Sequence, residues 1–444
     1  MEDYRLIADE LAADIAAGRL RPGQQLLPQR AFARRRGIAG STAGRVYREL
    51  VRRGLITGEV GRGSFVRARP EPQMPALTEP SRARVDLELN HPVAPGQAEL
   101  MARALGPLLR ADALEDALRP CGAAGTPAAR AHFAALVGGE GRQPAPEQLL
   151  FAGNGRQLLS AALTALVGPG ERLGVEALTY PMVKAVAHRL GIRLVPLPVD
   201  AYGLRPETLA AAHRSAPLRA LYVQPRGHNP LGGTLPEERR EALARELRRL
   251  DLVAVEDAVW SFLVPWAAPL SALAPERVIT VDSLSKRLAA GLTTGFAVVP
   301  RTLRDAVAAA LRSGGWTPGR FALEAGVRWL VDGTVAELEA AKREDARERG
   351  RLAAEALRGH AVRPAPHSYY RWWELPAPWR AETFVAAAER HGIAVTPAAA
   401  FAVGPHAAPS AVRLGLASPP LPELRRALTT LAHIARGAPE DFLE

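Results

Sequence analysis

The sequence contains very little cysteine and no long apolar run. Cys121 is the only cysteine among 444 residues, so an internal disulfide and a metal site built on a cysteine pair are both excluded. No apolar run approaches the roughly 20 residues that a membrane span needs. The acidic N-terminal segment also lacks the basic and apolar blocks of a signal peptide. These absences predict a cytoplasmic protein that has no membrane partner and binds no metal.

Lysine is also scarce, since the chain has only Lys184, Lys286 and Lys342 against a large number of arginines. A lysine in such a composition can be one whose chemistry arginine cannot perform, namely deprotonation and attack on a carbonyl to give a Schiff base. Lys184 and Lys342 lie in helical contexts typical of a protein surface. Lys286 follows a candidate acidic partner, Asp257, in the sequence and is the candidate catalytic residue. A plain surface lysine is the alternative interpretation.

The positive charge is concentrated near the N-terminus. The whole chain carries +11, of which residues 1–69 contribute +7 through fourteen arginines and seven acidic residues. A small basic unit on a nearly balanced large one indicates a nucleic-acid-binding module. The length suits two or three structural units. Prolines and weak periodicity mark residues 68–88 as a linker.

The basic end has the element order of a winged helix-turn-helix. Apolar residues at helical spacing predict a first helix that Gly18 ends, and a second helix over residues 29–36. Ser41 is the predicted N-cap of a third helix over residues 42–53. Residues 55–66 alternate like two strands joined by a glycine turn. The third helix is expected to direct Val46 and Leu50 inward and Arg45, Arg48 and Arg52 outward.

This segment resembles the GntR family of bacterial repressors over residues 3–67. The resemblance rests on Gly18-Arg-Leu-Arg-Pro-Gly, Leu27-Pro-Gln-Arg30, Ser41-Thr42, Gly54-Leu-Ile and Gly61-Arg-Gly-Ser-Phe-Val. It implies that the helix from Ser41 enters the major groove of double-stranded DNA and that the wing lies along the minor groove. The implied DNA-binding residues are Arg30, Ser41, Thr42, Arg45 and Arg62. A basic protein-interaction module of the same fold is the alternative.

The remaining chain predicts an α/β domain. Helical stretches alternate with short apolar runs such as residues 219–223, 252–255 and 278–281, which favours a mostly parallel sheet. Ligand sites of such sheets lie beyond the carboxyl ends of the strands. Candidate polar residues follow several of these runs. They are Gly153-Asn-Gly-Arg-Gln157 before a predicted helix over residues 158–167, together with Tyr180, Asn229 and Asp257.

The order and spacing of these residues resemble the fold type I aminotransferases, which use pyridoxal 5'-phosphate (PLP), over roughly residues 86–435. The resemblance implies that Lys286 forms the covalent link with the cofactor and that Asp257 pairs with the pyridine nitrogen. It further implies that Arg413 grips the α-carboxylate of an amino acid. The other implied cofactor-binding residues are Asn229 at the phenolic oxygen, Tyr180 on the ring, and Gly155, Arg156, Gln157, Ser283 and Ser285 around the phosphate.

A GntR-type module, a linker and an aminotransferase-like domain in this order resemble the MocR architecture. The implied organisation is a winged helix-turn-helix at residues 1–67, a linker at 68–88 and a PLP-binding, dimerising domain at 89–444. The last domain divides into a large part, 89–320, and a smaller C-terminal α+β subdomain, 321–444. The resemblance also implies a head-to-tail homodimer, with an amino acid or amine as candidate effector.

Several positions depart from the aminotransferase pattern. Thr293 stands where the family has an arginine for the cofactor phosphate, and we expect Arg156 to supply that charge instead. Val259 and Trp260 stand where a tyrosine follows the aspartate. Cys121 replaces a tyrosine that reaches the phosphate across the dimer. These changes keep the residues implied for the covalent link and for the pyridine nitrogen but remove other side chains that would adjust the cofactor. We therefore expect ligand binding rather than efficient turnover.

The sequence therefore predicts a PLP-responsive, DNA-binding transcription regulator. Two alternatives stay open: a working PLP-dependent aminotransferase that carries a DNA-binding module, and a regulator whose large domain has lost PLP and serves as a dimerisation scaffold. Residues 283–286 also fit the S-x-x-K pattern of serine acylases. That chemistry needs a second lysine in a Lys-Thr/Ser-Gly context, which the sequence lacks.

Overall fold

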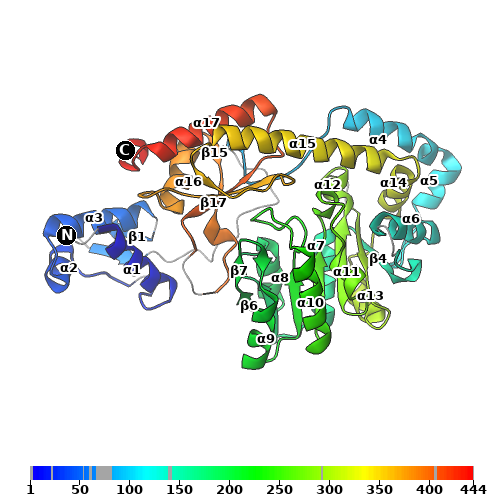
Figure 1. Cartoon of the computed structure of the whole chain (residues 1–444), viewed down its shortest axis with the longest axis horizontal. Coiled ribbons are helices and arrows are strands. Elements are labelled where there is room, and N and C mark those ends of the chain that lie inside the picture. The colour runs from blue at the N-terminus through cyan, green and yellow to red at the C-terminus, as the bar shows by residue number, and fades with distance from the viewer. Residues whose placement is uncertain are drawn as a thin grey trace.

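The computed structural model divides into an N-terminal helical unit, a large α/β part and a C-terminal α+β part (Figure 1). The residues that it describes are 4–21, 24–53, 55–59, 63–66, 83–138, 143–291, 294–404 and 408–443. Within these ranges, no helix combines the length and the apolar character needed to cross a membrane. The predicted wing residue Arg62, the departure at Thr293 and most of the predicted linker lie outside the described residues.

The N-terminal unit is a winged helix-turn-helix, as predicted. Helices α1 (Tyr4–Ala16), α2 (Gln29–Arg36) and α3 (Gly40–Arg52) precede the antiparallel strands β1 (Ile56–Glu59) and β2 (Gly63–Val66). Its small core includes Ile7, Phe32, Val46, Tyr47 and Leu50, so the predicted inward face of the third helix is confirmed.

The start of α3 differs from the prediction. Ala39 occupies the N-cap position without a side-chain cap, and Ser41, the predicted cap, lies exposed in the first turn. Gly37 ends α2 in the left-handed conformation (φ 67°), which glycine adopts without strain. No capping hydroxyl is used at the start of α3, where Ala43 is buried in the core.

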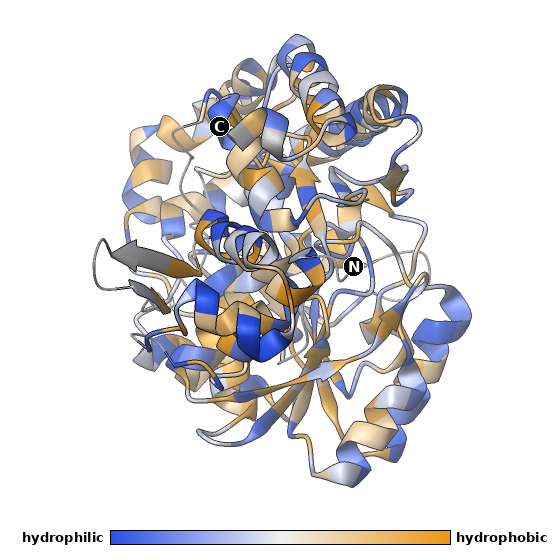
Figure 2. Cartoon of the chain, turned by 90° about the vertical axis from the view of Figure 1, so that its left-hand side faces the viewer, coloured by the Kyte–Doolittle hydropathy of each residue, from blue (hydrophilic) through white to orange (hydrophobic). Residues whose placement is uncertain are grey.

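The large part contains a seven-stranded, mostly parallel sheet that confirms the predicted α/β fold. The order is β4 (Leu149–Ala152), β12 (Gly295–Val298), β11 (Val278–Ser283), β10 (Val253–Asp257), β9 (Ala220–Val223), β5 (Arg172–Glu176) and β6 (Arg193–Leu197). Strand β12 is antiparallel to both neighbours and the other pairings are parallel. The strands are coloured mainly as hydrophobic, whereas the helices around them alternate in colour (Figure 2).

The large part also contains helices, several of which pack against this sheet. Helices α7 (Gly155–Leu166) and α13 (Arg304–Ser313) share one apolar cluster with the central strands. The other helices are α4 (Gln97–Leu105), α5 (Ala111–Ala117), α6 (Pro127–Val137), α8 (Pro181–Arg189), α9 (Pro206–Ser215), α10 (Glu237–Arg249), α11 (Leu270–Leu273), α12 (Leu284–Arg287) and α14 (Arg320–Val331). A short hairpin joins β7 (Val199–Asp200) and β8 (Gly203–Leu204).

The C-terminal part is built on a four-stranded antiparallel sheet, as predicted for an α+β subdomain. Its strand order is β13 (Ala361–Val362), β14 (Tyr370–Glu374), β17 (Ala411–Gly415) and β16 (Thr396–Pro397). The long helix α15 (Thr334–Ala356) runs along the top of the molecule from α14 to α17 (Figure 1). The remaining helices are α16 (Ala381–Arg390), α17 (Leu421–Arg436) and α18 (Glu440–Leu443).

The predicted linker ends earlier than residue 88. Strand β3 (Val85–Asp86) pairs in parallel with β15 (Ile393–Ala394), so the chain joins the C-terminal part before it enters the large part. The prediction missed this strand because two residues are too few to show a period. The N-terminal unit also contacts the C-terminal part, since Arg380 donates from Nε to the Asp9 carboxylate at 3.0 Å.

Candidate cofactor site and DNA-binding surface

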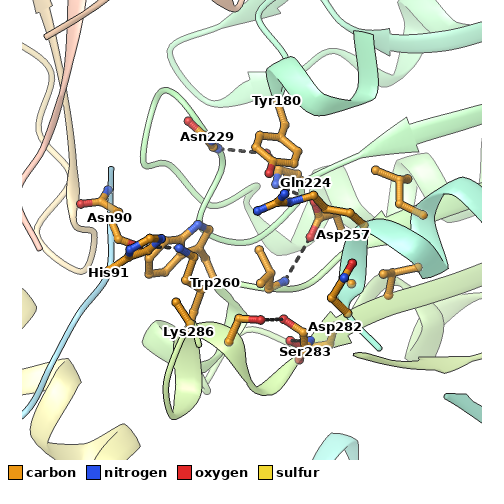
Figure 3. Close-up of a pocket in the computed structure, with 18 of the residues that line it drawn as sticks. Asn90, His91, Tyr180, Gln224, Asn229, Asp257, Trp260, Asp282, Ser283 and Lys286 are labelled. Atoms are coloured by element: carbon orange, nitrogen blue, oxygen red, sulfur yellow. Dashed lines mark hydrogen bonds between the residues drawn. The ribbon is translucent and has the colours of Figure 1, made fainter. Parts of the chain in front are cut away.

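A cavity of about 230 Å³ lies where the carboxyl ends of the central strands face the C-terminal part. It brings together every predicted cofactor or effector residue except Gln157. Figure 3 labels Tyr180, Asn229, Asp257, Ser283 and Lys286 among them. These lining residues are Gly155, Arg156, Tyr180, Asn229, Asp257, Ser283, Ser285, Lys286 and Arg413. The parallel sheet carries the ends of strands far apart in sequence to one edge, whereas Arg413 reaches the cavity from β17 of the C-terminal sheet.

The N-terminus of α7 forms one wall of this cavity. The helix begins at Gly155, three residues earlier than predicted, because Asn154 is its N-cap and accepts a hydrogen bond from the Gln157 amide at 3.0 Å. The amide of Gln157 is thereby occupied, and its side chain does not line the cavity. Gly295 leaves room for this turn, since a Cβ there would lie 2.4 Å from the carbonyl carbon of Asn154. A helix N-terminus of this kind suits a phosphate group.

Lys286 enters the cavity from α12. Its Nζ donates to the main-chain oxygen of Asn90 at 2.5 Å and lies 5.3 Å from the centroid of the Trp260 ring. Burial, and then the positive charges of Arg156 and Arg413, lower the pKa of Lys286 to about 7. A large fraction of the amine is therefore unprotonated near neutral pH and can act as a nucleophile.

The other two lysines correct the sequence-based expectation of surface positions. Lys342 is completely buried on α15, where Nζ donates to the main-chain oxygens of Lys286, at 3.1 Å, and Leu288. Burial lowers its pKa to about 8. Lys184 is half-buried and donates to the main-chain oxygens of Ala400 and Ala402, at 2.9 Å each. The helical pattern around both residues does not show that other segments pack over them.

Asp257 lies at the end of β10 and lines the cavity. Its Oδ2 accepts from the Tyr222 hydroxyl at 2.8 Å and from Gln224 Nε2 at 3.1 Å, and its Oδ1 accepts from the Val259 amide at 3.2 Å. Burial raises the pKa of Asp257 to about 6 despite these donors. The adjacent Glu256 does not line the cavity, since its Oε1 accepts from Arg226 at 3.0 and 3.1 Å. Alternation along the strand separates the two carboxylates.

Arg413 presents a buried guanidinium that has no carboxylate partner among the described residues. On β17 it lies 5.0 Å from the Tyr370 ring centroid and 5.1 Å from that of Phe401. It donates to Asn229 Oδ1 at 3.3 Å, to Thr396 Oγ1 at 3.0 Å and to the main-chain oxygen of Glu88, while its Nε has no partner. Burial lowers the pKa of Arg413. Such a group fits a carboxylate ligand.

These donors and acceptors fit PLP. The first turn of α7, the Ser283 and Ser285 hydroxyls and the exposed Arg156 offer donors of the kind that hold phosphate. The aspartate, the amine and Tyr180 lie in the same cavity (Figure 3). Among the positions that depart from the family, Trp260 contacts Lys286, whereas Cys121 does not line the cavity.

Several lining residues were not identified from the sequence. The main-chain oxygen of Asn90 accepts from Lys286. Its side-chain Nδ2 donates to the main-chain oxygen of Tyr369 at 3.2 Å, and its Oδ1 accepts from the Ala417 amide at 2.9 Å. Burial lowers the pKa of the adjacent His91 to about 4, so that imidazole is neutral at physiological pH. No local pattern around residues 90 and 91 indicates these contacts, because the partners come from distant segments.

The N-terminal unit presents basic side chains on its recognition helix. Arg45 and Arg48 are exposed on α3, and Ser41 is exposed at its start, whereas Thr42 is half-buried. Arg30 is exposed on α2. Arg52, expected to point outward, is half-buried and pairs with Glu49 at 3.3 Å. The helix therefore offers cations on the face opposite its apolar core, as contacts with phosphate require.

Comparisons with known proteins identify both parts of the chain. Residues 98–431 match the family model of class I and II aminotransferases, and residues 3–66 match that of the gntR family of bacterial regulatory proteins. The HTH-type transcriptional regulator YdeF of Bacillus subtilis (strain 168) is 29% identical over 436 residues, 97% of this chain and 94% of YdeF. The HTH-type pyridoxine biosynthesis transcriptional regulator PdxR of Corynebacterium glutamicum is 34% identical over 171 residues, 38% of this chain and 36% of PdxR.

Solved aminotransferases share the fold of the larger part. The multiple substrate aminotransferase of Thermococcus profundus gives a TM-score of 0.74 at 21% identity, covering 84% of this chain and 95% of that one. The alpha-aminoadipate aminotransferase LysN of Thermus thermophilus, complexed with N-(5'-phosphopyridoxyl)-L-leucine, gives 0.70 at 25% identity, covering 80% and 92%. The chain therefore belongs to the class I and II aminotransferase family through residues 98–431 and, with its GntR-family helix-turn-helix domain, is a transcription regulator of the MocR type.

Proposed function

We propose that this regulator binds PLP through Lys286 and that the bound cofactor, alone or with an amino acid, controls how the N-terminal domain binds DNA. The observation that carries the proposal is the cavity in which Lys286, with its pKa lowered to about 7, lies together with Asp257 and with Arg413, whose Nε has no partner among the described residues. When bound, PLP supplies an aldehyde for the amine and a ring that withdraws electrons once its nitrogen is protonated.

Each residue would have a separate task at that site. Lys286 would form the covalent link. Asp257, held by Tyr222 and Gln224, would accept a hydrogen bond from the protonated ring nitrogen. Arg156 and the first turn of α7 would neutralise the phosphate. Asn229 would donate to the phenolic oxygen. Arg413 would bind the carboxylate of an amino acid effector through its planar fork.

Control of DNA binding would then follow from a difference in affinity between two arrangements of the protein. A ligand shifts such an equilibrium only as far as it binds one arrangement better than the other. We propose a homodimer as the functional unit, because a paired operator site is read by two copies of a helix-turn-helix domain. The effector would be an amino acid or amine that reacts at the cofactor and contacts Arg413.

The test is to mix the purified full-length protein with PLP, record the visible spectrum, and measure binding to DNA from upstream of its own gene with and without PLP. A visible band that is lost in Lys286→Ala, together with a PLP-dependent change in DNA affinity, supports the proposal. A band that persists in Lys286→Ala contradicts it. Sustained transamination without DNA binding at low salt would favour the enzyme instead, and absence of any band would favour a scaffold that has lost PLP.

A further inference from the structure

A second cavity, of about 810 Å³, lies between the C-terminal half of α15 and the segment that leads through β13 to β14. It shares no lining residue with the cavity of Lys286. Its charged lining is strongly positive, because it contains one glutamate and five arginines. These residues are Glu344, Arg347, Arg351, Arg358, Arg363 and Arg371.

Most of these arginines form no ion pair among the described residues. Arg347 pairs with Glu344 at 2.6 Å. Within the part of the chain that the structure describes, the other four arginines form no ion pair. Asp200 and Glu374 lie near enough to Arg363 to act on its charge, and Arg363 donates to the main-chain oxygens of Asp200, at 3.3 Å, and Ala201. The cavity therefore concentrates positive charge that attracts an anion from solvent.

Arg371 distinguishes this cavity from a chance group of surface arginines. The residue is only 4% exposed, yet it lines the cavity. Its Nη1 donates to the main-chain oxygens of Ala365, Ser368 and Tyr370 at 2.8, 3.0 and 2.8 Å, which satisfy that nitrogen but carry no net charge. Burial lowers the pKa of Arg371 to about 10. Within the described residues Arg371 forms no ion pair, and a buried charge is costly without a partner of opposite sign, so a bound anion would stabilise this guanidinium.

Gly350 leaves space for the guanidinium of Arg371 against α15. A Cβ at residue 350 would lie 2.3 Å from Nη2 of Arg371, so no other residue fits there without displacing the guanidinium. Glycine is unfavourable inside a helix, and Gly350 lies within α15 and also lines the cavity. The absence of a side chain at this position leaves room for Nη2 at the wall of the cavity.

We propose that the cavity of Arg351, Arg358, Arg363 and Arg371 binds a small anion with at least two negative charges, seated on Arg371 through a phosphate or carboxylate group. Because Nη1 is already taken by three main-chain oxygens, such a group would accept hydrogen bonds from Nε and Nη2 of the planar guanidinium. A small molecule fits better than DNA, because the phosphates of a duplex lie on a convex surface and do not reach a side chain that is 4% exposed. The site is separate from the proposed PLP site and does not depend on it.

The test is calorimetric titration of the full-length protein with inorganic pyrophosphate and, separately, with citrate, in a low-salt buffer free of other multivalent anions. Loss of a charge-assisted contact predicts that Arg371→Met binds the preferred anion roughly tenfold more weakly or worse. The exposed double variant Arg351→Gln/Arg358→Gln carries the same expectation without disturbing the interior. Arg245→Gln, at an exposed arginine of α10, is the matched control and should bind like the parent.

The two anions distinguish the chemical source of the ligand. Tighter binding of pyrophosphate assigns a phosphate ligand, and tighter binding of citrate assigns a polycarboxylate. The PLP spectrum of Arg371→Met should match that of the parent, so failure at this cavity and failure at Lys286 are separate results.

Three outcomes would overturn the proposal. In the first, neither anion binds at millimolar concentrations. In the second, both the Arg371 variant and the double variant bind the anion as the parent does. Loss of anion binding in Arg156→Ala alone belongs to this outcome, because it assigns the anion to the phosphate-binding wall of the first cavity. In the third, the double variant weakens DNA binding while neither anion competes with DNA, which makes the patch a nucleic-acid contact.

Discussion

Lys342 donates from its buried ammonium group to the main-chain oxygen of Lys286 at 3.1 Å, so the side chain of one of the chain's three lysines is bound to the backbone of another. The same group also donates to the main-chain oxygen of Leu288, at the C-cap of α12. Lys342 thus holds the short helix that carries Lys286, and its positive charge contributes to the lowered pKa of the Lys286 amine.

Lys342→Met should therefore have two effects. The carbonyls of Lys286 and Leu288 would lose a charged donor, which should lower the free energy of unfolding by about 1 to 3 kcal/mol. The pKa of Lys286 should rise, because one of the charges that lower it is removed. Denaturant unfolding and the pH dependence of PLP attachment measure the two effects. Lys184→Met is the matched control, since Lys184 also donates to main-chain oxygens; an equal shift of the pH midpoint in both variants would contradict this role.

The rate of PLP attachment should rise with pH around pH 7. The amine attacks only when unprotonated, and the pKa of Lys286 is lowered to about 7, against about 10.4 for an ordinary lysine. The unprotonated fraction should therefore be large by pH 8 and change little above that. Stopped-flow absorbance over a pH series measures the midpoint. A rate that keeps rising up to pH 10 would indicate an ordinary lysine.

Asp257→Ala should weaken PLP binding, because the protonated ring nitrogen would lose its anionic partner. Loss of a hydrogen bond to a charged group corresponds to about 1.5 to 3 kcal/mol, or roughly ten- to a hundredfold in affinity. Glu256→Gln is the control: Glu256 pairs with Arg226 away from the cavity, so this change should lower stability and leave PLP affinity intact. Equilibrium titration followed in the visible region measures both. The reverse pattern would make Glu256 the partner of the ring.

Arg156→Ala should weaken PLP binding by roughly ten- to a hundredfold, since it would remove the charge expected to compensate for Thr293. Thr293→Arg in that background should restore part of the affinity. Arg189→Ala, an arginine whose guanidinium lies 5.5 Å from the Trp316 ring centroid and does not line the cavity, serves as control. Parental affinity in Arg156→Ala would refute the compensation.

Arg45→Ala and Arg62→Ala should each weaken DNA binding and leave the PLP spectrum unchanged. Each phosphate contact that is lost should also reduce the steepness of the salt dependence by about one unit, because fewer counterions are released on binding. Fluorescence anisotropy with an operator fragment across a salt series measures both quantities. Arg245→Ala on α10 provides the control. Weakening by an equal factor at all salt concentrations would argue against phosphate contacts.

The order and type of the main elements could be predicted from the sequence alone, because their signals are local. The apolar period of α3 places Val46 and Leu50 inward, and the short apolar runs become β9, β10 and β11 of a parallel sheet. A parallel sheet brings the ends of its strands to one edge, so the candidate residues that follow these runs were expected to converge. Boundaries were less accurate, as the start of α3 and the early end of the linker illustrate.

Which side chains are buried together depends on the packing of distant segments and could not be predicted from the sequence. Asn90 and Lys286 are 196 positions apart and meet through one hydrogen bond, and Lys342 is buried because a distant segment covers it. Gly350 and Arg371 likewise form one site from separate elements. Local periodicity identifies the face of a helix on which a residue lies, but its exposure and pKa depend on whatever packs against that face, which is a property of the whole fold.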